Sequence, residues 1–292
     1  MSVVDTIDEL AIARRFYAEE VAAVAGLDVP AIIEAFAIVP RERFLGPGPW
    51  LLCSADGGQT QFKYRRTPDA HPRHVLHNVP VAIDQERTLN NGQPSLLATW
   101  MQWLEIRPGD RIVHIGCGTG YFSAILSAIA GPTGSVTAIE VDPVLAARAR
   151  ENLVGYPRVV VIQGDATTLS APADVIMVNA GATHAQPAWL DALEEGGRLL
   201  LPLTFDAIPN TPGKGVVLKI TRRGETFAAT FGPMVAIYPC TAARDAEMNA
   251  ALQRGFMQWK HGQVKSIRTD SHSVADSCWA HRDGFCLSTM EP

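Results

Sequence analysis

Charged residues are scarce in this sequence: they make up 19% of its 292 residues, against about a quarter in an average domain. Long disordered segments are not expected, because disorder requires more charge and less apolar content. The chain also has no long basic run, and its formal net charge is −5. We therefore expect no binding of nucleic acid through neutralised phosphates.

Long apolar runs and cysteine are also limited. No stretch of about 18 apolar residues is free of charges or turn signals, so no membrane span and no membrane partner are predicted. The N-terminus has no basic region followed by an apolar core, which a signal peptide would need. The five cysteines are scattered and odd in number, so we expect no disulfide framework and a cytoplasmic location.

The N-terminal part of the sequence predicts helices and then a loop. Apolar residues recur at helical spacing over residues 7–25, and a second helix is predicted over residues 29–38, with Pro30 in its first turn. Residues 46–74 contain several prolines and glycines and little periodicity. They predict a long loop, either a solvated surface loop or a flap that recognises a substrate.

From residue 94 onward, helix-like and strand-like segments alternate. A helix over residues 94–104 precedes the predicted strands 111–115, 135–140, 159–163, 175–179 and 198–202. The helices between them are predicted over residues 121–130, 143–153 and 186–194. Such alternation predicts an α/β fold with a doubly wound, mostly parallel sheet.

The last part of the chain predicts a hairpin, a helix and a polar tail. The hairpin strands cover residues 215–221 and 226–231, and the helix runs from residue 244 to about residue 259. We expect three regions: a helical cap with its loop (residues 1–78), a core (residues 79–240) and an extension packed on that core (residues 241–292).

A glycine-rich loop is the strongest local signal. The apolar strand ending at Ile115 is followed by Gly116-Cys117-Gly118-Thr119-Gly120 and then by a helix. Glycines allow a ligand to approach the backbone, and the helix N-terminus offers unpaired N–H groups. The spacing G-x-G-x-G does not match the dinucleotide fingerprint, and no P-loop is present. It resembles the loop of S-adenosylmethionine-dependent methyltransferases.

Two acidic residues support a nucleoside ligand. Glu140 ends the second predicted strand, 20 residues beyond Gly120, where a carboxylate can accept from both ribose hydroxyls. Asp165 follows the third strand and is suited to accept from an adenine amino group. Taken alone, Glu140 is more simply interpreted as a solvated surface residue and Asp165 as a turn residue. Together with the glycine loop, they predict a cofactor site.

Beyond the loop, the chain resembles the protein-L-isoaspartate O-methyltransferase family. Residues 39–44 read V-P-R-E-R-F, similar to the family's V-P-R-x-x-F, and residues 80–83 read P-V-A-I, similar to its P-L-x-I. The family's T-I-S-Q-P corresponds to T-L-N-N-G-Q-P at residues 88–94. The resemblance covers roughly residues 9–240. It implies the methyltransferase (Rossmann-like) fold and S-adenosyl-L-methionine as cofactor, bound through Gly116, Cys117, Gly118, Gly120, Tyr121, Glu140, Asp165, Ala166 and Asn179.

The segment at residues 88–94 departs from the family. Two residues are inserted, and the serine that the family places beside cofactor and acceptor is absent. A carboxylate acceptor is ionised at pH 7, so it needs no base, and neutral hydrogen-bond donors suffice to position it. The candidates for this catalytic role are Thr88, Asn90, Asn91 and Gln93.

Other histidines and cysteines carry weaker hypotheses. His184, which follows the fourth strand, is the nearest candidate base for a hydroxyl or amine acceptor, although a polar loop histidine is the simpler interpretation. His272, Cys278, His281 and Cys286 match no paired C-x-x-C ligand pattern, so we expect no metal.

Together these features predict a carboxyl O-methyltransferase acting on L-isoaspartyl, or aspartyl-derived, carboxylates of a peptide or protein. One alternative is an O-methyltransferase of the same fold with a specialised acceptor, such as a natural-product peptide or small molecule. Another is a cofactor-binding protein without transferase activity. The sequence predicts no oligomeric state.

Overall fold

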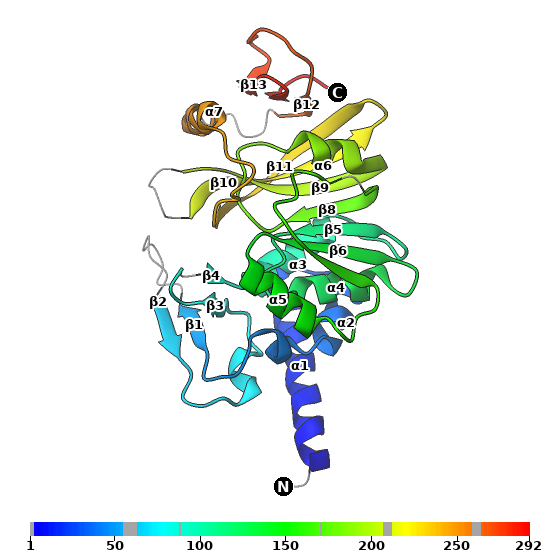
Figure 1. The fold of residues 1–292 in the computed structure, drawn as a ribbon, viewed down its shortest axis with the longest axis vertical. Helices are drawn as coiled ribbons and strands as arrows, with labels where there is room; N and C mark the ends of the chain where they lie inside the picture. Colours follow the sequence, from blue (N-terminus) through cyan, green and yellow to red (C-terminus); the bar gives the residue numbers. More distant parts are fainter. Residues whose placement is uncertain (1–2, 55–62, 88, 170, 207–211, 259–263) are drawn as a thin grey trace. The chain divides into compact units, whose positions relative to one another are not determined.

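The computed structural model describes residues 3–54, 63–87, 89–169, 171–206, 212–258 and 264–292 (Figure 1). The chain forms two compact units, each built from several segments. Unit 1 comprises Met1–Gly109, Cys117–Ala138 and Asp142–Ile162, and unit 2 comprises Asp110–Gly116, Ile139–Val141 and Gln163–Pro292.

Unit 1 contains most of the helices. They are α1 (Val3–Ala25), α2 (Pro30–Ile38), the 3-10 helix η1 (Arg41–Phe44), η2 (Pro72–Val75), α3 (Pro94–Trp103), α4 (Tyr121–Ala130) and α5 (Pro143–Asn152). Helix α1 contacts α2 and α3, and α2 contacts α4. The Phe36 ring of α2 lies edge-on to Tyr17, Tyr121 and Phe122, with centroids 6.0–6.4 Å apart, a favoured aromatic geometry.

The predicted loop over residues 46–74 is wrong in part, because it contains a two-stranded antiparallel sheet. Strand β1 (Leu51–Ser54) pairs with β2 (Lys63–Arg66), and the residues that connect them, 55–62, lie outside the described residues. A second small sheet in unit 1 pairs β3 (Ala82–Asp84) with β4 (Leu89–Asn90).

The main sheet has the strand order β13-β14-β12-β11-β10-β9-β8-β5-β6-β7. Its strands are β5 (Arg111–Ile115), β6 (Ser135–Glu140), β7 (Val159–Gln163), β8 (Ala173–Val178), β9 (Leu193–Phe205), β10 (Gly213–Arg223), β11 (Thr226–Ile237), β12 (Ser266–Arg268), β13 (Cys278–Arg282) and β14 (Phe285–Ser288). The bounds predicted for β5, β6 and β7 are confirmed, and β9 extends well beyond its prediction.

The sheet is mixed, with β9 at the change of direction. Strand β8 pairs parallel with β5 and with β9, whereas β9–β10, β10–β11, β11–β12, β12–β14 and β13–β14 are antiparallel. The predicted polar tail instead contains the three strands β12, β13 and β14 between residues 266 and 288. Short antiparallel strands need only local connections, so they can extend a sheet without crossover helices.

Strand β11 contains a β-bulge. Val216 of β10 pairs with Met234, and Leu218 pairs with Phe231, so Gly232 and Pro233 together oppose a single residue of β10. On its other side, β11 pairs with β12 at Phe227 and Ala228. The bulge interrupts the ladder in the middle of a 12-residue strand.

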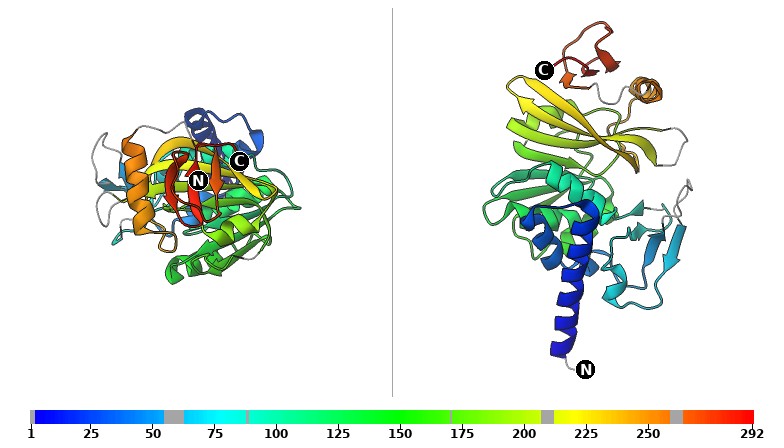
Figure 2. Two further views of the ribbon diagram at one scale, coloured as in Figure 1. Left: turned by 90° about the horizontal axis from the view of Figure 1, so that it is seen from above. Right: turned by 180° about the vertical axis from the view of Figure 1, so that it is seen from behind.

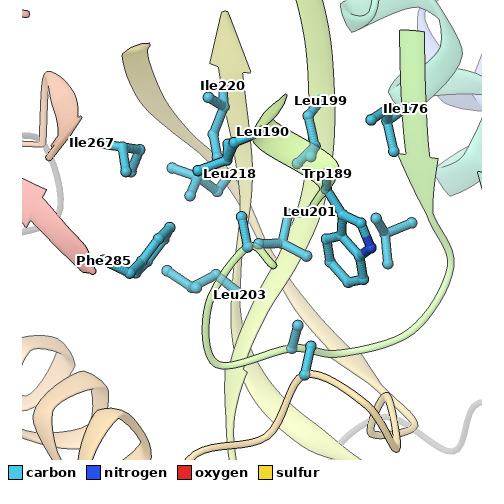
Figure 3. Packing of buried hydrophobic residues seen from close by; sticks show 14 of the residues in the cluster. Ile176, Trp189, Leu190, Leu199, Leu201, Leu203, Leu218, Ile220, Ile267 and Phe285 are labelled. Atoms are coloured by element: carbon cyan, nitrogen blue, oxygen red, sulfur yellow. The ribbon is translucent and has the colours of Figure 1, made fainter. Parts of the chain in front are cut away.

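The core of unit 2 lies between the sheet and two helices, α6 (Pro187–Ala192) and α7 (Ala246–Met257). Trp189 and Leu190 of α6 lie among the leucines of β9 and β10, as Figure 3 shows. Helix α7 packs against β9 and β13, and Figure 2 shows it beside the C-terminal strands. Trp189 is fully buried; complete burial of a large apolar side chain contributes about 1.5–3 kcal/mol.

Candidate functional site

The carboxyl ends of β5 and β8 lie side by side in unit 2. The Asn179 N–H donates to the Ile115 carbonyl at 2.8 Å, and the Gly116 N–H donates to the Ile139 carbonyl at 2.8 Å. Gly116 has φ +76°, a conformation that glycine adopts without the strain that a side chain would bring. Asn179 Oδ1 is buried and has no hydrogen-bond partner among the described residues. This edge therefore holds an unused acceptor beside the start of the glycine loop.

The two predicted acids lie at the carboxyl ends of β6 and β7, where these strands enter unit 2: Glu140 is the last residue of β6, and Asp165 comes two residues after β7. The Gly164 N–H donates to the Glu140 carbonyl at 2.9 Å, which joins the ends of β6 and β7. Glu140 is buried, at 7% exposure, whereas Asp165 is exposed. Asp165 Oδ1 accepts from the Thr167 hydroxyl at 2.7 Å and from its N–H at 3.0 Å, and these bonds lower the pKa of Asp165. Asp165 therefore stays ionised at neutral pH in a fixed orientation.

Ala166 adopts an unusual backbone conformation for a residue with a Cβ. Its φ is +61°, and its carbonyl accepts from the indole N–H of buried Trp189 at 2.9 Å. A positive φ at a non-glycine residue costs of order 1 kcal/mol and is often found at functional sites. The tryptophan holds the turn after Asp165 in place.

The remainder of the glycine loop belongs to unit 1. Gly118 has φ +58° and Gly120 has φ +91°, and Gly120 is the N-cap residue of α4. A Cβ on Gly120 would lie 2.7 Å from Leu153 Cδ1, which excludes a side chain unless Leu153 moves. Cys117 is buried, and its Sγ lies 3.8 Å from the Gly118 carbonyl. At Gly118 and Gly120 the loop therefore presents backbone without a side chain.

Tyr121, which we predicted in the cofactor site, points its side chain elsewhere. The residue is 1% exposed, and its hydroxyl lies 3.3 Å from that of Tyr17 within the aromatic cluster around Phe36. At the first turn of α4, only its backbone N–H is placed to bind an anionic or polar ligand group.

Of the predicted acceptor-binding residues, Asn90 and Gln93 are engaged within unit 1. Asn90 accepts from the Gly92 N–H at 2.9 Å and donates to the Tyr64 hydroxyl at 3.3 Å. Gln93 donates its amide to the backbone and side-chain oxygens of Asn78, at 2.6 and 2.9 Å. Both side chains therefore hold the segment in shape.

Asn91 differs from these two. Its Oδ1 accepts from the Val81 N–H at 2.8 Å and from Arg41 at 3.4 Å, and these two donors fix which amide atom is oxygen. Its Nδ2 is buried and has no hydrogen-bond partner in the described part of the chain. Asn91 thus holds an unused amide donor. Thr88 lies outside the described residues.

Arg41, to which sequence reasoning gave no role, organises this segment. The residue is fully buried, and its guanidinium donates to the carbonyls of Val75, His77 and Val79 at 2.7, 2.7 and 2.6 Å. The guanidinium also lies 5.4 Å from the centre of the Tyr17 ring. The three carbonyls are more than 30 residues away in sequence, so the V-P-R motif was the only signal in the sequence for this role.

His184, the candidate base, is buried at 5% exposure in unit 2. Its Nδ1 lies 3.0 Å from the Thr183 hydroxyl and its Nε2 lies 3.5 Å from the Gln186 amide. Burial, and then the positive charge of Arg282, lower the pKa of His184 to about 4. The ring is therefore neutral at pH 7 and packs edge-on against Phe285.

Comparison with known proteins identifies one family. The model of the protein-L-isoaspartate(D-aspartate) O-methyltransferase family matches residues 63–210. A protein-L-isoaspartate O-methyltransferase of Ignicoccus hospitalis is 34% identical over 161 residues, which cover 53% of this chain and 73% of that protein. A second, from Pelobacter propionicus, is 31% identical over 203 residues, covering 68% of this chain and 77% of the relative.

Solved structures share the fold. One protein-L-isoaspartate O-methyltransferase aligns with a TM-score of 0.57 at 22% identity, covering 84% of this chain and 69% of that one. A Plasmodium falciparum protein described as the same enzyme, in complex with S-adenosyl-L-homocysteine, aligns with a TM-score of 0.60 at 16% identity. The alignment covers 78% of this chain and 98% of that one. The predicted α/β methyltransferase fold is confirmed. In the described part of the chain, no helix is both long and apolar enough to cross a membrane.

Proposed function

The chain belongs to the protein-L-isoaspartate O-methyltransferase family, and from this premise we propose that it methylates the carboxylate of L-isoaspartyl, or related aspartyl-derived, residues in peptides or proteins. As a member of this family it is a methyltransferase that uses S-adenosyl-L-methionine. The acceptor is the proposed part.

The carboxyl ends of the strands in unit 2 suit this cofactor. Gly116 carries no side chain, and Asn179 Oδ1 is a buried acceptor with no hydrogen-bond partner in the part of the chain that the structure describes. Such an atom costs about 1–3 kcal/mol unless a ligand donates to it. We assign Glu140 to the ribose hydroxyls and Asp165 to the adenine amino group, because both are acceptors at adjacent strand ends. In unit 1, Cys117, Gly118, Gly120 and Tyr121 would contribute backbone groups.

The reaction requires positioning more than proton transfer. When bound, the cofactor supplies an electrophilic methyl group on a sulfonium. The residues of the site would hold a carboxylate oxygen of the acceptor in line with this methyl group, so that the oxygen could take the methyl group as the sulfur leaves. The acceptor is ionised at pH 7, since its pKa is about 4, so no base is required. The neutral, buried state of His184 agrees with such a mechanism.

Asn91 carries the acceptor part of the proposal. Its Nδ2 is a neutral donor with no hydrogen-bond partner among the described residues, and it lies in the segment where the family has its serine. A neutral amide can orient a carboxylate without forming the strong ion pair that would hold it in the ground state. Arg41 is a positioning residue, because it fixes Asn91 Oδ1 and the chain at residues 75–79.

Asn91→Asp tests this role. The carboxylate keeps an acceptor for the Val81 N–H and Arg41, so the fold is retained, but the donor is lost and a negative charge is added. One charge-assisted hydrogen bond contributes about 1.5–3 kcal/mol, so kcat/KM on an isoaspartyl peptide should fall about 10–100-fold with cofactor affinity unchanged. Asn249→Asp on α7, the same change in unit 2, is the control and should leave kcat/KM unchanged. An equal loss of cofactor affinity, or full activity of Asn91→Asp, would refute this role.

Transfer of labelled methyl to an isoaspartyl peptide, as a base-labile ester, tests the reaction itself. The two inserted residues in the 88–94 segment favour one alternative, a specialised acceptor such as a natural-product peptide or small molecule. Label on such an acceptor, with none on the isoaspartyl peptide, would select it. Tight cofactor binding without transfer to any acceptor would select a binding protein. The scattered, odd-numbered cysteines support a reducing, cytoplasmic location as part of the proposal.

A further inference from the structure

Four potential metal ligands converge in the C-terminal part of unit 2. The ligand atoms of His272, Cys278, His281 and Cys286 all lie within 4.8 Å of one another. His272 Nε2 is 3.6 Å from Cys278 Sγ, and the two imidazole centroids are 4.6 Å apart. In a tetrahedral zinc site with bonds of about 2.0–2.3 Å, ligand atoms are separated by about 3.3–3.8 Å. The observed cluster is close to that size before any ion is added.

The hairpin of β13 and β14 explains how three of the ligands meet. His281 pairs with Cys286 across the hairpin, so their side chains lie on the same face. Cys278 is three residues before His281, and in a regular strand it would point to the opposite face. An irregularity in register between Cys278 and Ala280 adds the extra residue that returns Cys278 to the shared face. His272 comes from the loop before β13.

The histidines are arranged as ligands rather than as isolated polar groups. His272 Nδ1 donates to the Asp270 carbonyl at 2.9 Å and lies 3.4 Å from its carboxylate, which leaves Nε2 to face Cys278. Metal-bound histidines are commonly oriented by such a bond from the second ring nitrogen. His281 Nδ1 is buried and has no hydrogen-bond partner among the described residues. A buried nitrogen of this kind is costly unless it receives a proton or a metal.

We propose that His272, Cys278, His281 and Cys286 form a structural zinc site. Two thiolates and two neutral imidazoles neutralise Zn²⁺, and two sulfur plus two nitrogen ligands in a tetrahedron are typical of zinc. Four protein ligands leave no position for water or substrate, so the ion is structural. The sequence expectation of no metal was based on the absence of a C-x-x-C pair. In the structure, the pairing of β13 with β14 and the bulge after Cys278 bring the ligands together without that spacing.

The site would stabilise the C-terminal strands on the core of unit 2. β12, β13 and β14 have only three, five and four residues, so their ladders alone supply little stability. Trp279, next to Cys278, packs on α7 so closely that a Cβ on Gly255 would lie 2.8 Å from its ring. Phe285, next to Cys286, packs against His184. The metal would thus anchor two aromatic contacts of the core. This role does not depend on methyl transfer.

Metal analysis of the full chain tests the proposal. Protein purified without chelators should contain about one zinc ion per chain. Cys278→Ser and Cys286→Ser should each lose it, whereas Cys53→Ser, at a buried cysteine of unit 1, should retain it. Cobalt(II) in place of zinc should show the intense visible absorption of a tetrahedral thiolate site in the wild type and in Cys53→Ser.

X-ray absorption of the zinc protein decides the case if the serine variants do not fold. Two sulfur neighbours at about 2.3 Å and two nitrogen neighbours at about 2.0–2.1 Å support the site. Zinc bound by oxygen and nitrogen only would overturn it. Three other results would do so as well: no zinc retained after incubation and gel filtration, unchanged zinc in both serine variants, or a Cys278–Cys286 disulfide in protein purified under reducing conditions.

Discussion

Arg41→Lys keeps the positive charge of Arg41 and removes its planar fork. The arginine serves three backbone carbonyls from two nitrogens, Val75 and His77 from Nη1 and Val79 from Nη2. A lysine has one nitrogen and cannot occupy both positions, so at least one carbonyl loses its donor. A hydrogen bond from a charged group contributes about 1.5–3 kcal/mol, and an unsatisfied buried carbonyl adds to the loss. We expect Arg41→Lys to lower the free energy of unfolding by about 2–4 kcal/mol.

Urea denaturation and hydrogen exchange measure this effect. The urea concentration at the midpoint of unfolding should fall, while the dependence of the free energy of unfolding on urea concentration stays unchanged. Two backbone N–H groups should exchange faster. The Val81 N–H donates to Asn91 Oδ1, and the Asn91 N–H donates to the Val81 carbonyl. Arg15→Lys is the control, because Arg15 forms an exposed ion pair with Glu34 and should change stability by less than about 0.5 kcal/mol.

Arg41→Met separates hydrogen bonding from the cost of burying a charge. If the hydrogen bonds dominate, methionine destabilises more than lysine, because all three carbonyls lose their donor. If desolvation dominates, the neutral side chain is as stable as arginine or more so. An Arg41→Met protein at least as stable as the wild type would therefore refute the reasoning, as would an Arg41→Lys loss below about 0.5 kcal/mol.

Two further substitutions test the glycine loop and the buried histidine. Gly120→Ala should cost about 1–3 kcal/mol and weaken S-adenosyl-L-homocysteine binding, measured by calorimetry, because φ is +91° and the new Cβ would meet Leu153. His184, with a folded pKa of about 4 against 6.5 unfolded, contributes stability that is present above pH 6.5 and is lost as the pH falls toward 4. The free energy of unfolding should fall by about 3 kcal/mol over this change of pH. His184→Gln should make the urea midpoint less dependent on pH between 6.5 and 4.

Matched variants give these two tests their controls. Gly131→Ala also has a positive φ, +71°, but its Cβ would meet nothing within 4 Å, so it should lower stability without affecting cofactor binding. Equal cofactor affinities for the two glycine variants would contradict the role of Gly120. A pH profile of His184→Gln that is as steep as that of the wild type would show that other groups control acid stability.

Sequence reasoning was most reliable where one local pattern determines the structure. Apolar strands beside a glycine loop define β5, β6 and β7, whose bounds were predicted correctly, and the positive φ of Gly116 and Gly120 follows from the same motif. These features depend on neighbouring residues, so the chain carries their signal within a few positions.

Non-local pairing explains what the sequence did not reveal. Strand β2 reads Lys63–Arg66, a polar run with no alternation, and becomes a strand only because β1 pairs with it. The unused donor of Asn91 and the engaged amides of Asn90 and Gln93 differ only through partners elsewhere in unit 1. In the C-terminal strands, a one-residue bulge decides which side chains share a face, and no spacing rule anticipates a bulge.

The bulge at Gly232 and Pro233 affects how readily β11 can pair with a strand of another chain. A regular 12-residue strand near the end of a sheet offers a long template on which another chain can add its own strand. Pro233 has no N–H to donate, and the extra residue twists the strand locally, so a straight incoming strand cannot follow it. The interruption therefore shortens the regular stretch of β11 that another chain could extend, and it does so through a defect in the ladder rather than through surface charge.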